Sequence, residues 1–222
     1  MKGPIPASFL KANSAIALYE RYYVDIEFER SGLFEALRLV CPADAVLYPG
    51  CFVHITPSFF FSHVVYVDRD PIAREFFLNQ ESVSRYISKY KKYKRSPYVH
   101  FIAQDYSAAV PLADESFDMV ISLFAPKAAL ICKRYLRNSG ILLTNDHPTA
   151  ASDRQFELIA VVQQLGGKYT FRESELGQFL AHKRTGKPTK DHLRRSHRGL
   201  RYMDKDPYFV FRKRRLDNGR AR

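Results

Sequence analysis

Short apolar runs alternate along most of the chain with longer stretches of helical periodicity. Runs of strand length, which are nearly continuous in apolar residues, lie at 45–48, 64–67, 99–102, 117–123 and 140–144. Stretches with helical spacing of apolar residues lie at 14–40 (with a break near Ser31), 71–94, 127–136 and 154–165. This alternation is typical of a mostly parallel sheet with helices on both faces. We therefore predict a doubly wound α/β fold.

Two further apolar runs, at 168–171 and 208–211, predict late strands, which brings the expected sheet to seven strands. The chain shows no internal repeat and no low-complexity linker, so we expect a single domain. Within it we expect N-terminal helices at 1–44, a core at 45–181, a basic insertion at 182–206, and a last strand with a basic tail at 207–222.

The turn after the first predicted strand is the first candidate for a binding site. In open parallel sheets, ligands bind beyond the carboxyl ends of the strands, where the strand order reverses. The first strand ends at Tyr48 and is followed by Gly50, which allows close backbone approach. Thr56 and Pro57 then predict a helix start, with threonine as the N-cap, and such a turn favours a carboxylate or phosphate.

Polar residues also follow the next four predicted strands. Asp68 ends the second strand, where a carboxylate can accept hydrogen bonds from ribose hydroxyls. Asp105 follows the third strand, where an acid could receive an adenine amino group. Ser122–Phe124 lie at the carboxyl end of the fourth strand, and residues 145–147 directly follow the fifth.

These motifs, in this order, resemble those of the class I S-adenosylmethionine-dependent methyltransferase superfamily. The resemblance rests on "VLYPG", "VVYVD", "AQD", "SFDMVISL" and "RNSGILLTND", and it covers about residues 45–211. The form "YPG…TPSFFF" is similar to that of a bacterial branch of the superfamily. The resemblance implies a Rossmann-like sheet whose late strands form an antiparallel C-terminal hairpin.

The resemblance also implies a cofactor, S-adenosylmethionine, and the residues that contact it. Asp68 would hold the ribose, Asp105 and Tyr106 the adenine. The methionine part and the methyl group would meet Tyr48, Gly50, Cys51, Phe52, Ser122, Leu123 and Phe124. The chain departs from the family pattern of an acid followed by alternate glycines, because Tyr48, Gly50, Phe52 and His54 stand at those positions.

Three residues are candidates for a catalytic base by position, namely His54, Asp146 and His147. Methyl transfer from a sulfonium needs alignment more than acid–base chemistry, although an acceptor with an acidic proton needs a nearby base. The "NPPY"-like motif of amino-group methyltransferases that act on bases is absent, since the position reads "SLFA". The histidines and the three cysteines show no spacing typical of a metal site or of a disulfide framework.

The net charge of the whole chain is +12, and the positive charge is concentrated in three segments. Residues 84–95 hold six Lys/Arg and no acid, residues 182–201 hold eight Lys/Arg and one acid, and residues 212–222 hold six and one. Such faces suit phosphates or another acidic partner, although a solvated surface is equally typical. The residues expected to contact a nucleic acid are Lys183, Arg184, Arg194, Arg195, Arg198 and Arg201.

Two function classes follow from these patterns. The first is a methyltransferase of unknown acceptor, with a nucleic acid favoured. The alternative is a non-catalytic protein of the same fold that binds nucleic acid or a protein through its basic surfaces. Dinucleotide oxidoreduction is disfavoured, because the loop lacks GxGxxG. With no membrane span, no secretory signal and unpaired cysteines, we expect a cytoplasmic protein, and the oligomeric state stays open.

Overall fold

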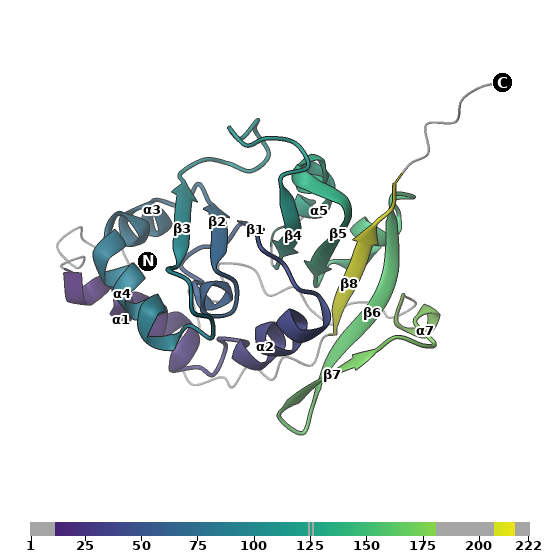
Figure 1. The fold of residues 1–222 in the computed structure, drawn as a ribbon, viewed down its shortest axis with the longest axis horizontal. Coiled ribbons are helices and arrows are strands. Elements are labelled where there is room, and N and C mark those ends of the chain that lie inside the picture. Colours follow the sequence, from purple (N-terminus) through teal and green to yellow (C-terminus); the bar gives the residue numbers. More distant parts are fainter. Residues whose placement is uncertain (1–11, 124, 126, 181–206, 216–222) are drawn as a thin grey trace, which may run out of the picture.

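The computed structural model describes residues 12–123, 125, 127–180 and 207–215. The basic insertion at 182–206, with its six predicted nucleic-acid contacts, and Phe124 lie outside these residues. One mixed sheet organises the rest (Figure 1). Its strands are β1 Val46–Pro49, β2 His63–Val67, β3 Tyr98–Ile102, β4 Phe117–Ser122, β5 Leu136–Thr144, β6 Phe156–Leu165, β7 Lys168–Arg172 and β8 Tyr208–Lys213.

The strand order is β3-β2-β1-β4-β5-β8-β6-β7. Strands β1 to β5 are parallel to one another, and β8 is antiparallel to both β5 and β6. The order reverses between β1 and β4, which places the expected ligand-binding point at their carboxyl ends. The predicted α/β class, the mostly parallel sheet and the antiparallel C-terminal part are confirmed.

Helices cover both faces of the sheet, as predicted. Alternate residues of each central strand point to opposite faces, so Tyr48 and Tyr66 join one core while Leu47 and Val65 join the other. The first core is completed by α1 Ala12–Tyr19, α2 Ser31–Val40, α3 Pro71–Leu78 and α4 Gln80–Tyr90. The second is completed by α5 Ala128–Ile131, α6 His147–Ala151 and α7 Gly177–Leu180.

The prediction of a helix at 154–165 is wrong, because β6 occupies Phe156–Leu165 and raises the strand count from seven to eight. This strand lies between β8 and β7, and its middle residues Ala160, Val161 and Val162 are all buried. A strand buried on both faces has a continuous apolar run that periodicity cannot distinguish from a buried helix. Gly166 and Gly167, both with positive φ, then form the two-residue turn into β7.

The helix predicted to start at Thr56 is also wrong, since only a single 3-10 turn, Thr56–Phe59, stands between β1 and β2. The Thr56 hydroxyl does not cap this turn. It forms a hydrogen bond of 2.8 Å with the Tyr19 hydroxyl instead. Tertiary contact with α1 has therefore replaced the local cap.

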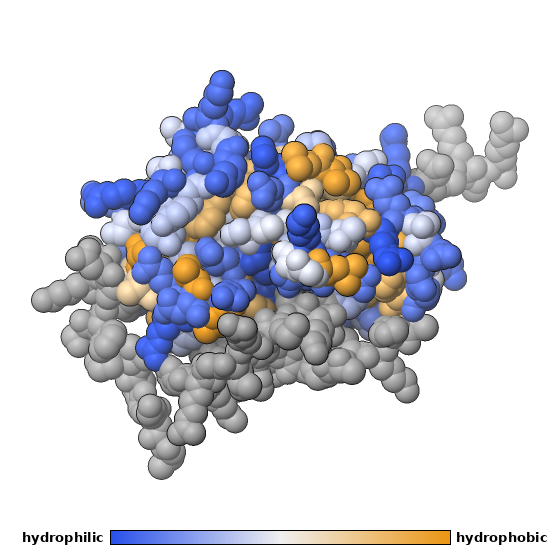
Figure 2. Space-filling model, turned by 90° about the horizontal axis from the view of Figure 1, so that it is seen from below, coloured by the Kyte–Doolittle hydropathy of each residue, from blue (hydrophilic) through white to orange (hydrophobic). Residues whose placement is uncertain are grey.

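The surface of the molecule is mainly hydrophilic on the face shown in Figure 2, where apolar side chains form separate patches. None of the helices in the described part of the chain combines the length and the apolar character that a bilayer-spanning helix requires.

Candidate functional site

The turn after β1 is tightly packed at the point where the strand order reverses. Gly50 has a φ of +66° and donates its N–H to the carbonyl oxygen of Val67, at 2.8 Å. A Cβ atom at position 50 would lie only 2.8 Å from the Cβ of Ala125, in the turn after β4. The backbone of the first turn therefore approaches the second turn as closely as a glycine allows.

Asp68 ties this turn to the end of β2. Its side chain is 1% exposed, and one carboxylate oxygen accepts the N–H of Phe52 at 2.8 Å. The other oxygen accepts the N–H of Asp70 at 3.0 Å, just before α3. Phe52 itself has a φ of +50°, a left-handed conformation unusual for a bulky residue. The carboxylate therefore stabilises a strained turn at the reversal point.

The residues after β3 also reach this edge of the sheet. The Asp105 carboxylate lies 2.6 Å from the guanidinium of Arg69 and accepts the backbone N–H of Ser107. Hydrogen bonds from Ser107, assisted by the charge of Arg69, lower the pKa of Asp105. The half-buried ring of Tyr106 lies beside Gly50, with a ring carbon 3.6 Å from the place of a Cβ there.

The predicted residues on β4 and in the first turn mostly point inward. Ser122 is 1% exposed and donates to the carbonyl oxygen of Ala125 at 3.3 Å, and Leu123 is fully buried. Cys51 is 1% exposed, and its thiol donates to the carbonyl of Phe52. Tyr48 is also buried. Four parts of the described chain meet at the reversal point, namely the turn after β1, the turn after β4, Asp68 and Tyr106.

His54 lies in the interior, where both ring nitrogens have partners. Nε2 donates to the carbonyl oxygen of Glu29 at 3.0 Å, because a carbonyl can only accept. Nδ1 therefore accepts from the Tyr48 hydroxyl, also at 3.0 Å. The ring stacks on Tyr23 with a centroid separation of 4.4 Å. Burial, and after it the charge of Arg30, lower the pKa of His54 to about 3. These contacts support a structural role for His54 rather than that of a base.

The depressed pKa of His54 predicts a loss of stability in mild acid. Below the ordinary pKa of 6.5 the unfolded chain binds a proton at this histidine, whereas the folded chain does not until about pH 3. The contribution is therefore fully present above about pH 6.5 and falls by at most about 1.4 kcal/mol for each pH unit below it. Urea unfolding at a series of pH values measures this slope. His54→Gln keeps one donor and one acceptor without titrating, so its slope should be shallower. Equal slopes would contradict the assignment.

The other two candidate bases lie after β5, which β4 separates from β1 in the sheet. The Asp146 carboxylate accepts a hydrogen bond from the Thr149 hydroxyl at 3.0 Å, at the start of α6. His147 is 4% exposed, packs against Phe209 and donates from Nε2 to the carbonyl of Leu180 at 3.3 Å. Both side chains thus support α6, and a role as base stays a prediction.

Two residues that contribute to this edge were not found from the sequence. Ala125 sets the space available at Gly50, and Tyr22 packs its ring edge-on against Phe52, with centroids 5.2 Å apart. Neither residue type signals a site by itself, and Tyr22 lies far from the turn in the sequence. Only the tertiary structure brings them together.

The residues at the reversal point fit a nucleoside cofactor in composition. Asp68 provides a carboxylate at the end of β2, Gly50 allows close approach of the backbone, and Tyr106 provides an aromatic ring. A carboxylate at the end of β2 is the group that would accept hydrogen bonds from ribose hydroxyls in this fold. Among the described residues, no group of three His, Cys, Asp or Glu side chains could hold a metal ion.

Comparison with solved structures shows which fold this is. The chain is similar to a methyltransferase from Geobacter sulfurreducens, with 10% sequence identity, a TM-score of 0.50, and coverage of 90% of this chain and 88% of that chain. It is also similar to the MccD protein, with 12% identity, a TM-score of 0.50, and coverage of 85% and 97%. No protein-family model and no curated protein matches the sequence. The chain therefore has the fold of the class I S-adenosylmethionine-dependent methyltransferases, as its motifs predicted.

Proposed function

We propose that the protein is a methyltransferase that binds S-adenosylmethionine at the carboxyl ends of β1, β2 and β3. The observation that carries this proposal is the position of Asp68, which follows β2 and bonds to the turn after β1 where the strand order reverses. A carboxylate at this point can accept ribose hydroxyls. The fold shared with a solved methyltransferase supports the same conclusion.

In this proposal the chain binds and orients two reactants. Asp68 would hold the ribose, while Asp105 and the ring of Tyr106 would lie at the adenine. The bound cofactor supplies a methyl group on a sulfonium, and alignment with the acceptor is the main requirement for its transfer. With His54 neutral and enclosed by Glu29 and Tyr48, we assign it to support of the turn rather than to proton transfer.

We favour a nucleic acid as the methyl acceptor. The support is the concentration of positive charge in a few segments of a chain with a net charge of +12. Lys183, Arg184, Arg194, Arg195, Arg198 and Arg201 remain the proposed contacts. A phosphate backbone bound by such residues gives an affinity that falls steeply with salt.

One observation favours the alternative of a non-catalytic protein with this fold. The Asp68 carboxylate is almost fully buried and already accepts two backbone N–H groups, which is sufficient reason for an acid at this position. Such a protein would bind nucleic acid or another protein and ignore the cofactor.

Calorimetric titration of Asp68→Asn with S-adenosylmethionine separates the two functions. Asparagine keeps the shape and one acceptor but removes the charge. We expect cofactor affinity to fall roughly 10- to 100-fold, as for the loss of hydrogen bonds to a charged acceptor. The control is Asp114→Asn, which should leave the affinity unchanged. Asp114 lies just before β4, and its carboxylate pairs with Arg134. Equal affinity of wild type and a folded Asp68→Asn protein would contradict the placement of the site.

A further inference from the structure

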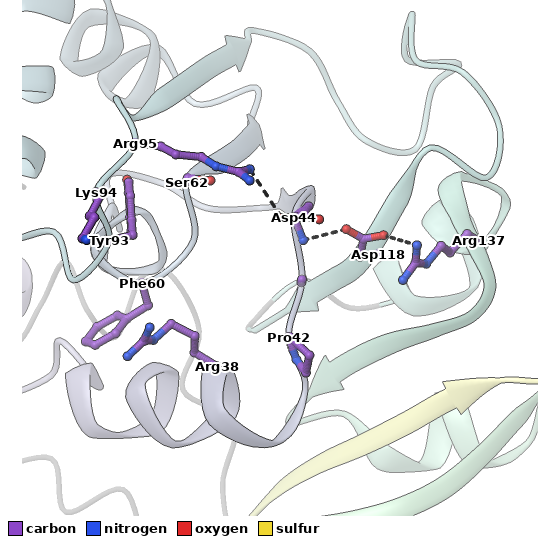
Figure 3. Close-up of a pocket in the computed structure, with 11 residues that line it drawn as sticks. Arg38, Pro42, Asp44, Phe60, Ser62, Tyr93, Lys94, Arg95, Asp118 and Arg137 are labelled. Atoms are coloured by element: carbon purple, nitrogen blue, oxygen red, sulfur yellow. Dashed lines mark hydrogen bonds and ion pairs between the residues drawn. The ribbon is translucent and has the colours of Figure 1, made fainter.

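A concave site lies on the side of the sheet opposite the reversal point, beyond the amino ends of β1 and β2 (Figure 3). Its volume is about 540 Å³, which lies within the roughly 300–1,000 Å³ typical of small-molecule sites. Four cationic side chains line it, together with two acids. The cations are Arg38, Lys94, Arg95 and Arg137, and the acids are Asp44 and Asp118.

One of the two acids in this lining, Asp118, has a structural role. Asp118, near the start of β4, accepts the backbone N–H groups of Asp44 and Ala45 at 2.7 and 2.8 Å. Its other oxygen lies 2.7 Å from the guanidinium of Arg137. Asp118 therefore holds the chain that enters β1, and its charge is balanced by Arg137.

The remaining cations of the pocket are only weakly neutralised. Arg95 lies 3.7 Å from Asp44, and the two side chains are 77% and 90% exposed, so this pair contributes little. Within the described ranges, Arg38 and Lys94 have no acidic partner, and the buried Nε of Arg38 has no hydrogen-bond acceptor. An anion in the pocket would balance the charge of the Arg38 guanidinium, which pairs with no acid in the described part of the chain.

The segment that carries two of these cations is held in place. The Nζ of Lys91 donates to the carbonyl oxygens of Lys94 and Arg95. The Tyr93 hydroxyl donates to the carbonyl of Ser58 at 2.7 Å. The pocket is thus presented by an ordered turn after α4, rather than by independent surface lysines.

We propose that this pocket binds a phosphate group, carried either by a small molecule such as a nucleotide or by a nucleic-acid strand. Arginine forks and lysine match phosphate oxygens in charge and geometry. The four cations exceed the two acids by two charges, which suits either one dianionic phosphate monoester or two adjacent monoanionic phosphodiester groups. Rings of Phe60 and Tyr93 also line the pocket and offer an apolar wall to the rest of the ligand. This site is separate from the one proposed for the cofactor, and its test requires no cofactor.

The test is a titration of the purified full chain with three probes, namely inorganic phosphate, adenosine monophosphate and an end-labelled single-stranded RNA oligonucleotide. Arg38→Gln combined with Lys94→Gln should weaken binding of the preferred probe roughly 10- to 100-fold, because two charged donors are removed. The matched control is Arg74→Gln combined with Arg154→Gln. It removes the same charge from exposed positions that do not line the pocket.

Binding of phosphate or the mononucleotide alone would identify a small ligand, and binding of the RNA alone would identify a nucleic-acid backbone. Either result supports the proposal if the pocket variant loses affinity and the control does not. Lys94→Gln alone, at an exposed position, replaces the double variant if thermal melting shows that the latter is unfolded. No binding of any probe by the wild type, or equal losses in the pocket and control variants, would overturn it.

Discussion

Replacing Gly50 by alanine is expected to lower the free energy of unfolding by about 2 to 5 kcal/mol. The φ of +66° costs a side-chain-bearing residue about 1–2 kcal/mol. The new methyl group would also lie 2.8 Å from the Cβ of Ala125, and overpacking of this kind typically costs about 1–3 kcal/mol. Urea unfolding of wild type and variant measures the difference.

A second substitution separates these two costs. In Gly50→Ala combined with Ala125→Gly, the obstructing methyl group is removed while the left-handed backbone remains. We expect the double variant to recover the part of the loss that comes from the contact, after correction for Ala125→Gly alone. Strictly additive effects would show that the turns after β1 and β4 do not touch at this point.

Replacing His54 by alanine is expected to destabilise the protein by at least about 3 kcal/mol. The substitution leaves the Tyr48 hydroxyl and the Glu29 carbonyl without this partner, and each unsatisfied buried group costs about 1–3 kcal/mol. It also leaves a cavity against the ring of Tyr23, since the histidine is fully buried.

His54→Gln is the comparison that identifies the cause. Glutamine offers an amide oxygen to Tyr48 and an amide N–H to Glu29, so it should lose clearly less stability than alanine. If methyl transfer is detected, the glutamine variant should retain most of it, because we assign His54 to structural support. A folded His54→Gln protein that binds cofactor but has lost transfer would instead mark His54 as a base.

Much of the fold follows from the sequence because a parallel sheet leaves a clear signature. The strands that end at Pro49, Val67 and Ser122 are buried on both faces, so their runs are almost entirely apolar and are separated by polar turns. The same property caused the error at β6, whose long apolar run has the length of a helix. The conformation of β6 depends on its pairing with β7, which follows it directly in the sequence, and with β8, which lies much later. The periodicity of a single segment carries no information about such pairing.

The candidate site is predictable only where position along a strand determines position in space. Asp68 and Asp105 follow adjacent parallel strands, so their proximity to one edge of the sheet follows from the pattern. The burial of His54 depends on Tyr23 and Glu29, which come from the segment before β1. The contact of Gly50 with Ala125 joins two turns that are far apart in the sequence. Such contacts require the tertiary structure.

The central claim is that the edge formed by Asp68 and the turn after β1 holds S-adenosylmethionine. Its most direct test is calorimetric titration of the wild-type protein with S-adenosylmethionine and its demethylated product, with NAD as the control ligand. The account predicts micromolar binding of the first two and none of NAD. Absence of heat with both sulfur compounds, in a sample shown to be folded, would contradict it and favour the non-catalytic alternative.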